Sequence, residues 1–236
     1  MSRPEKPMTS VSTSLICKAS ILIGAAALAL AALGGCGLVP AKETLSMYAP
    51  EVHVQADPAW PTVRWQLQVP RPHASELLDS ARIVVRPADG ELQVYHGAVW
   101  AEPVPDLVQD AIVHAFEDSG RIAGVARRGS GIGGDYELLL DLRHFDSDYN
   151  GGGTPHAQVQ LVAKLLSASN NTIVATRAFE ADTVAGGTSV GEVARAFDAS
   201  LTQVVQALVG WTLVQGTEYE RRNPPLATPA AKPGRR

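Results

Sequence analysis

The sequence predicts an α+β fold, with a single mostly antiparallel sheet and two amphipathic helices packed on one of its faces. Several segments alternate apolar and polar residues with the period of two that is typical of half-buried strands. Two other segments repeat apolar residues at helical spacing. The clearest strands and both helices are apolar on one side only, which favours one sheet covered on one face.

The N-terminal strands come first in the domain. Residues 63–69 alternate strictly, with Trp65 and Leu67 on one face and Gln66 and Gln68 on the other. Residues 82–86 and 91–100 are two further strands, and the Pro-Ala-Asp-Gly sequence at 87–90 supplies turn chemistry between them. We therefore expect a hairpin here.

The remaining elements follow in the order helix, strands, helix. Apolar residues at helical spacing predict a helix from Pro103 to a C-terminal cap at Gly120. Alternation then predicts a short strand at 122–127 and a three-stranded antiparallel meander formed by residues 136–145, 157–165 and 172–180. A capping box at 189–192 opens a long helix that we expect to end near Leu213.

The N-terminus has the pattern of a lipoprotein signal peptide. Basic residues precede the uncharged run at 19–33, which is short for a membrane-spanning helix. The run ends in a lipobox formed by Leu33, Gly34, Gly35 and Cys36. We expect residues 1–35 to be removed and Cys36 to carry a diacylglycerol and an N-acyl chain. An uncleaved anchor is the alternative, although the glycines and Pro40 would end its helix early. Met8 is a second candidate start.

These signals divide the rest of the chain into three parts. Residues 36–62 hold four prolines and read as a tether, residues 63–215 form the domain, and residues 216–236 are a basic, proline-rich tail that we expect to be disordered. Cleavage removes three basic residues and one glutamate, a net +2, so the formal charge changes from −4 to −6. The mature chain then has no free thiol, and its charge gives no indication of nucleic-acid binding.

Catalytic motifs are not evident in the sequence. The six histidines show no metal-ligand spacing, so we expect neither a metal nor a cofactor apart from the acyl groups. Residues 129–134 match the Gly-x-Gly-x-x-Gly fingerprint, but a strand follows them instead of the helix that a phosphate site needs. Asp141, His144 and Asp146 offer an acid-base group, for which a solvated strand edge is the simpler interpretation.

Trp100, at the end of the hairpin, has two interpretations. Core packing is the simpler one. Contact with a partner is the other, because tryptophan is favoured at binding hot spots.

Several stretches resemble the ABC-type transport auxiliary lipoproteins, the PqiC/YmbA-like proteins associated with MCE transport systems. The resemblance rests on residues 77–87 (Leu-Leu-Asp-Ser-Ala-Arg-Ile-Val-Val-Arg-Pro), 90–95, 100–103 and 118–120, and on the order of the later strands and the last helix. It covers residues 67–213, and the proline-rich stretch at 49–61 departs from it.

The resemblance implies a periplasm-facing lipoprotein on the outer membrane. Such a protein would work with an MCE-domain protein, a permease and an ATPase in lipid transport between membranes, and it would have no catalytic residues. Gly37 after the cysteine is compatible with outer-membrane placement. A homo-oligomer is one form that it could take. Two alternatives stay open, a lipoprotein scaffold or chaperone for envelope assembly and a lipid-modifying enzyme.

Overall fold

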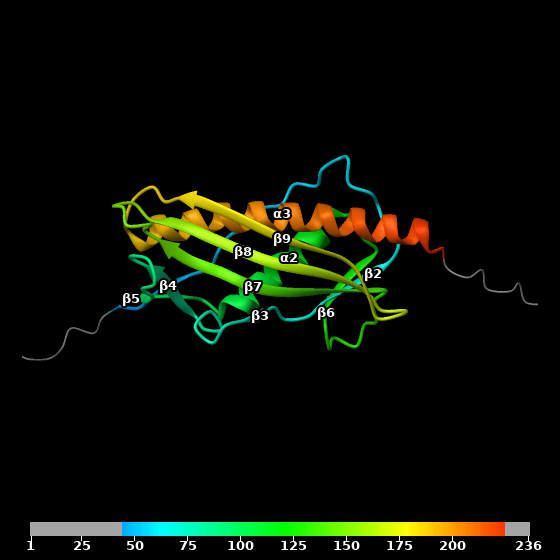
Figure 1. Ribbon diagram of the computed structural model, residues 1–236, viewed down its shortest axis with the longest axis horizontal. Coiled ribbons are helices and arrows are strands. Elements are labelled where there is room, and N and C mark those ends of the chain that lie inside the picture. Colours follow the sequence, from blue (N-terminus) through cyan, green and yellow to red (C-terminus); the bar gives the residue numbers. More distant parts are fainter. Residues whose placement is uncertain (1–43, 225–236) are drawn as a thin grey trace, which may run out of the picture. The chain divides into compact units, whose positions relative to one another are not determined.

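One long strand, β7 (Tyr136–Asp148), organises the sheet in the computed structural model, which describes residues 44–224. On one edge, β7 pairs antiparallel with β8 (His156–Ser167), and β8 pairs antiparallel with β9 (Thr172–Val184). These three strands are the meander that the alternation predicted (Figure 1). They provide the longest ladders of the sheet. All nine strands of the described residues belong to this one sheet, which confirms the predicted α+β class with a single sheet.

The other edge of β7 is covered by three short strands in turn. β2 (Gln66–Val69) pairs with its start, β3 (His73–Ala74) with its middle and β4 (Arg82–Arg86) with its end, all in parallel. β6 (Gly124–Arg127) adds parallel to β2. The sheet is therefore mixed, although its long ladders are antiparallel.

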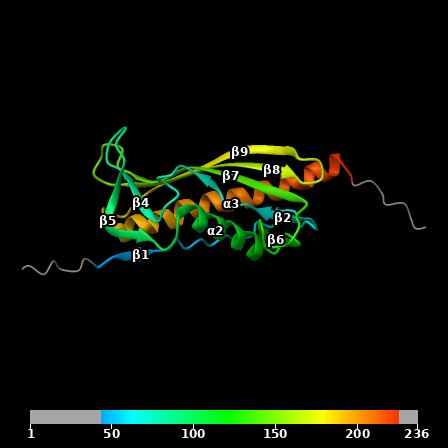
Figure 2. The ribbon, with the colours of Figure 1, turned by 90° about the horizontal axis from the view of Figure 1, so that it is seen from below.

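The predicted hairpin closes one end of the sheet. β4 pairs antiparallel with β5 (Gln93–Trp100), and β1 (Ser46–Tyr48) pairs parallel with β5. Figure 2 shows these three strands gathered at the end of the molecule where α3 begins.

A β-bulge in β7 changes which residues face the core. Its register with β8 moves from Leu142 opposite Leu161 to His144 opposite Gln160, so Arg143 has no partner. The even-numbered leucines before the bulge point inward, whereas after it the odd-numbered Phe145 is fully buried.

Two helices pack against the sheet. α2 (Val104–Ser119) ends at Gly120, whose φ of 61° is the left-handed cap conformation that the sequence predicted. α3 (Val190–Arg222) begins at Ser189, whose hydroxyl donates to Glu192 at 2.8 Å. α3 packs against β8, β9 and α2, and the core lies between these elements.

α3 extends nine residues beyond the predicted end at Leu213. Gly216 lies inside the helix, and the indole of Trp65 packs directly against it. A Cβ added to Gly216 would come within 2.6 Å of this indole. Tyr219 packs edge-on to Tyr136, with ring centroids 6.2 Å apart. The expectation of disorder is therefore wrong for residues 216–222, while residues 225–236 lie outside the described part.

Residues 48–65, here called the strap, lie along α3 in the direction of the helix. The Glu51 amide donates to Asp198 Oδ1 at 3.0 Å, and the Gln55 amide donates to Gln206 Oε1 at 3.0 Å. Further along, Trp60 covers Gly210. The predicted tether is therefore wrong from residue 44 onward. Its prolines suit an extended backbone, which α3 holds at Glu51, Gln55 and Trp60.

Candidate functional site

The lipobox residues Leu33, Gly34, Gly35 and Cys36 lie outside the described residues, so their predicted role stays a prediction. Thr44, the first described residue, lies eight positions after Cys36 in the sequence. Between residues 44 and 224, no helix is long and apolar enough to cross a membrane.

Trp100 belongs to the core. Its side chain is 1 % exposed, and its ring lies edge-on to Phe145 and Phe197 at centroid distances of 5.5 and 5.1 Å. Because no partner could reach a ring buried in this way, the partner-contact interpretation is wrong. The bulge in β7 explains the arrangement, since it turns Phe145 inward to meet Trp100.

The Asp–His group divides between two environments. Asp141 lies on the outer face of the sheet, 3.4 Å from Arg143 Nε, as a surface ion pair. Asp146 is buried and accepts from Arg86 Nε at 3.3 Å, with His144 Nδ1 at 3.1 Å. The interpretation as a solvated strand edge is wrong for Asp146, which is buried because β8 keeps β7 paired as far as Asp148.

This buried carboxylate is suited to holding the structure together. Arg86, its first partner, comes from β4, and His144, its second, comes from β7 like Asp146 itself. The contacts therefore join two strands. Among residues 44–224, no group of three His, Cys, Asp or Glu side chains could hold a metal ion.

The Gly-rich loop leads directly into β7, as the alternation predicted. Gly129 and Gly131 have φ values of 93° and 82°, so they serve the turn itself.

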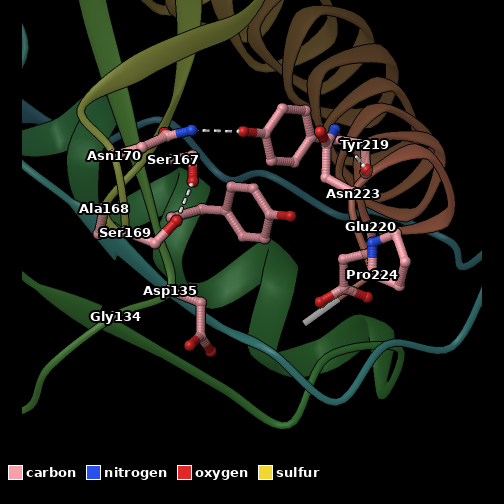
Figure 3. A pocket seen from close by; sticks show the side chains of 11 residues that line it. Gly134, Asp135, Ser167, Ala168, Ser169, Asn170, Tyr219, Glu220, Asn223 and Pro224 are labelled. Atoms are coloured by element: carbon pink, nitrogen blue, oxygen red, sulfur yellow. Dashed lines mark hydrogen bonds between the residues drawn. The ribbon is translucent and has the colours of Figure 1, made fainter. Parts of the chain in front are cut away.

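A cleft of about 670 Å³ lies at the far end of the sheet, where α3 ends (Figure 3). Three segments line it: the start of β7 with Gly134 and Asp135, the β8–β9 turn with residues 167–170, and the last turn of α3 with Tyr219 and Glu220. The Asn170 amide donates to Tyr219 Oη at 2.8 Å, which ties the turn to the helix.

Two carboxylates give the cleft its charge. Asp135 Oδ2 accepts from the Gln66 amide at 2.8 Å. Desolvation, together with the charge of Asp135, raises the pKa of Glu220 above its ordinary value. Burial, followed by the charge of Glu220, raises the pKa of Tyr136 to about 12, so its hydroxyl is neutral at pH 7. The cleft therefore suits hydrogen-bond donors or a cation.

The hydroxyl of Ser167 is hydrogen-bonded to neither of the two carboxylates that line the cleft. Its Oγ lies 3.0 Å from Ser169 Oγ rather than near a histidine or carboxylate, whereas a nucleophilic serine needs such a base. The sequence did not reveal the cleft, because four of its eleven lining residues, Tyr219, Glu220, Asn223 and Pro224, lie in the segment that was expected to be disordered.

Comparison with known proteins decides the family. The family model of the ABC-type transport auxiliary lipoprotein component matches residues 44–209. The chain belongs to this family. The match confirms the resemblance seen in the sequence, and its start at residue 44 includes the strap. Tyr219 and Glu220 of the cleft lie beyond the matched range.

This auxiliary lipoprotein is similar to several solved and curated proteins. A Xanthomonas campestris protein of the family DUF330 is 50% identical, with a TM-score of 0.72 over 75% of this chain and 99% of its own. An uncharacterized Bradyrhizobium diazoefficiens protein is 29% identical over 76% of this chain. The chain spans about half of that protein, 47% of its length. An uncharacterized protein with 15% identity and a TM-score of 0.56 over 70% of this chain and 97% of its own shares the fold.

Proposed function

We propose that this protein is the membrane-anchored accessory lipoprotein of an MCE/ABC-type lipid transport system. It is held on the outer membrane by the acyl groups on Cys36, faces the periplasm and docks an MCE-domain protein, and through it an ABC permease and ATPase. The observation that carries the proposal is the match of residues 44–209 to a transport auxiliary lipoprotein family. The lipobox at 33–36 supports the anchor.

The chemistry of the described residues favours a mechanical role. The family is a transport component rather than an enzyme family. The buried Asp146 is engaged by Arg86 and His144, and Ser167 is paired with another serine. The protein would therefore act by holding and contacting other components, with the lipid on Cys36 fixing its position. A homo-oligomer would suit such docking, because repeated copies can surround one conduit.

Co-purification from detergent-solubilised membranes tests the proposal. The native chain is compared with Cys36→Ala, which cannot be acylated, and with Cys17→Ala as the matched control, because Cys17 lies in the segment that is removed. We expect the MCE-domain protein with the native chain and with Cys17→Ala, and its loss with Cys36→Ala.

Two results would contradict the proposal. Recovery of no MCE-domain protein with the native chain would contradict the docking role, and recovery of outer-membrane assembly factors instead would favour the scaffold alternative. Equal recovery of the MCE-domain protein with Cys36→Ala would show that the anchor does not position the partner.

A further inference from the structure

The described chain starts at the end of the domain where α3 begins, here called the entry end. β1 lies beside β5 there, and an added Cβ on Gly191 would lie 3.8 Å from Tyr48 Oη. The β4–β5, β7–β8 and β9–α3 connections meet at the same end, because Arg86, Asp148, His156 and Val184 pair in succession across the sheet. Figures 1 and 2 show this gathering.

The strap limits how far the domain can move from a lipid on Cys36. A free tether as far as Val63 would be 27 positions long and could span about 90 Å. Because residues 48–65 are held along α3, only the eight positions from Cys36 to Thr44 separate the lipid from the first described residue of the domain. They span at most about 28 Å. α3 itself has 33 residues and is about 50 Å long. The anchor therefore holds the entry end much nearer to the bilayer than the end that carries the cleft.

Exposed apolar side chains are concentrated at the entry end. They are Leu45, Met47, Leu92, Val94 and Val184, with exposed fractions from 38% to 71%. Within residues 44–224, the other two large exposed apolar side chains, Ile132 and Ile173, lie toward the opposite end. Single exposed apolar residues are common. What favours a lipid contact is that five of these seven lie where the anchored segment joins the domain.

The charges of this end favour a zwitterionic surface over an anionic one. The tip of the β4–β5 turn exposes Asp89 and Glu91, and Asp182 is exposed on β9 next to Val184. Arg86, at the end of β4, is engaged by Asp146 and Asp148.

We propose that the entry end rests on a zwitterionic phospholipid surface and that α3 leads away from it, so that the cleft beside Tyr219 faces the periplasmic partner. This inference rests on the lipid anchor of the proposed function. Leu45 and Met47 enter the interface beside the anchor, and the β4–β5 turn and Val184 contact the headgroups.

β9 offers a matched pair of positions for the test. Val184 and Ile173 are 58% and 51% exposed, and they lie near opposite ends of this one strand. They are eleven positions apart, or about 36 Å along a strand. Val184→Cys and Ile173→Cys each introduce the one free thiol of the acylated mature chain, which takes an environment-sensitive fluorophore.

The labelled full-length lipoproteins are placed in phosphatidylcholine vesicles with brominated acyl chains, and vesicle binding is checked by flotation. We expect bromine quenching and a blue shift for the label at 184, and neither for the label at 173. Leu92→Cys and Ile132→Cys form a second pair with the same expectation. Replacing part of the phosphatidylcholine with phosphatidylglycerol should reduce the quenching at 184.

The outcomes separate this inference from the proposed function. A chain that floats with the vesicles but shows equal quenching, or none, at 184 and 173 overturns the orientation and leaves the anchor standing. Stronger quenching with phosphatidylglycerol overturns the zwitterionic preference. A native chain that does not float overturns the anchor and the orientation together.

Discussion

Replacing Trp100 with alanine should destabilise the domain strongly, because its ring fills the centre of an aromatic cluster. The side chain is 1 % exposed and contacts Phe145 and Phe197, which stack on each other at 4.6 Å. Truncating a buried tryptophan typically costs about 3–5 kcal/mol of the free energy of unfolding. Since a domain has about 5–15 kcal/mol in total, the loss would take about a fifth or more of the free energy of unfolding.

Trp100→Phe is the matched control. The indole N–H of Trp100 is buried without a hydrogen-bond partner, and such a group costs about 1–3 kcal/mol. Phenylalanine keeps part of the ring volume and removes that cost, so the expected loss is less than half of that for alanine. Val184→Ala, at a 58% exposed side chain, should stay within about 0.5 kcal/mol.

Urea unfolding followed by far-UV circular dichroism measures these differences, on a Cys36→Ala background so that no acyl chain contributes. The denaturant slope should be the same for all variants, so that a shift in midpoint reports stability. A loss below about 1 kcal/mol for Trp100→Ala would refute core packing. Loss of partner recovery by Trp100→Ala in the chain that keeps Cys36, without loss of stability, would restore the contact interpretation.

Three further predictions concern other parts of the domain. Asp146→Ala should cost about 3 kcal/mol in urea unfolding, because it removes the buried partner of both Arg86 and His144 and leaves Arg86 only the longer contact with Asp148 at 3.9 Å. Asp141→Ala on the outer face should cost less than about 1 kcal/mol, and equal losses would contradict the assigned environments. Gly120→Ala should lower stability by about 1 kcal/mol, because its φ of 61° strains an L-residue, and an unchanged thermal midpoint would be inconsistent with that cap. Desolvation raises the pKa of Asp198 above its ordinary value of 3.8, so the folded state binds the proton more tightly than the unfolded state, and stability is lost as the pH rises from the unfolded pKa through the folded one. Asp198→Asn keeps an oxygen acceptor for the Glu51 amide, so the thermal midpoint should rise at pH 7 and change little below pH 3.8; a rise of the same size at both would argue against the pKa shift.

The features that the sequence predicted correctly are those with local patterns. The face of α3 that packs on the sheet, the cap at Gly120 and the alternation of the meander each follow from neighbours within a few positions in the chain. Such patterns fix the type of an element because burial repeats with the period of the backbone. The family resemblance also rested on local runs of residues, and the family match confirms it.

The features that the sequence did not predict depend on contacts between distant segments. The strap had no period of its own and looked like a tether, yet Asp198 and Gln206, about 150 positions away, supply its hydrogen bonds. The last turns of α3 looked too polar to fold, but Trp65 and Tyr136 cover them. The cleft could not be predicted without those turns.

The sequence by itself therefore determined the α+β class, the two helical faces and the family, because these depend on periodicity and on recognisable runs of residues. Only the tertiary structure decided that β7 carries three parallel strands along one edge, that its bulge buries Phe145 against Trp100, and that the strap is held along α3. Each of these depends on which distant backbone and side-chain groups satisfy one another. That pairing is set by the geometry of the whole core, which no single segment encodes.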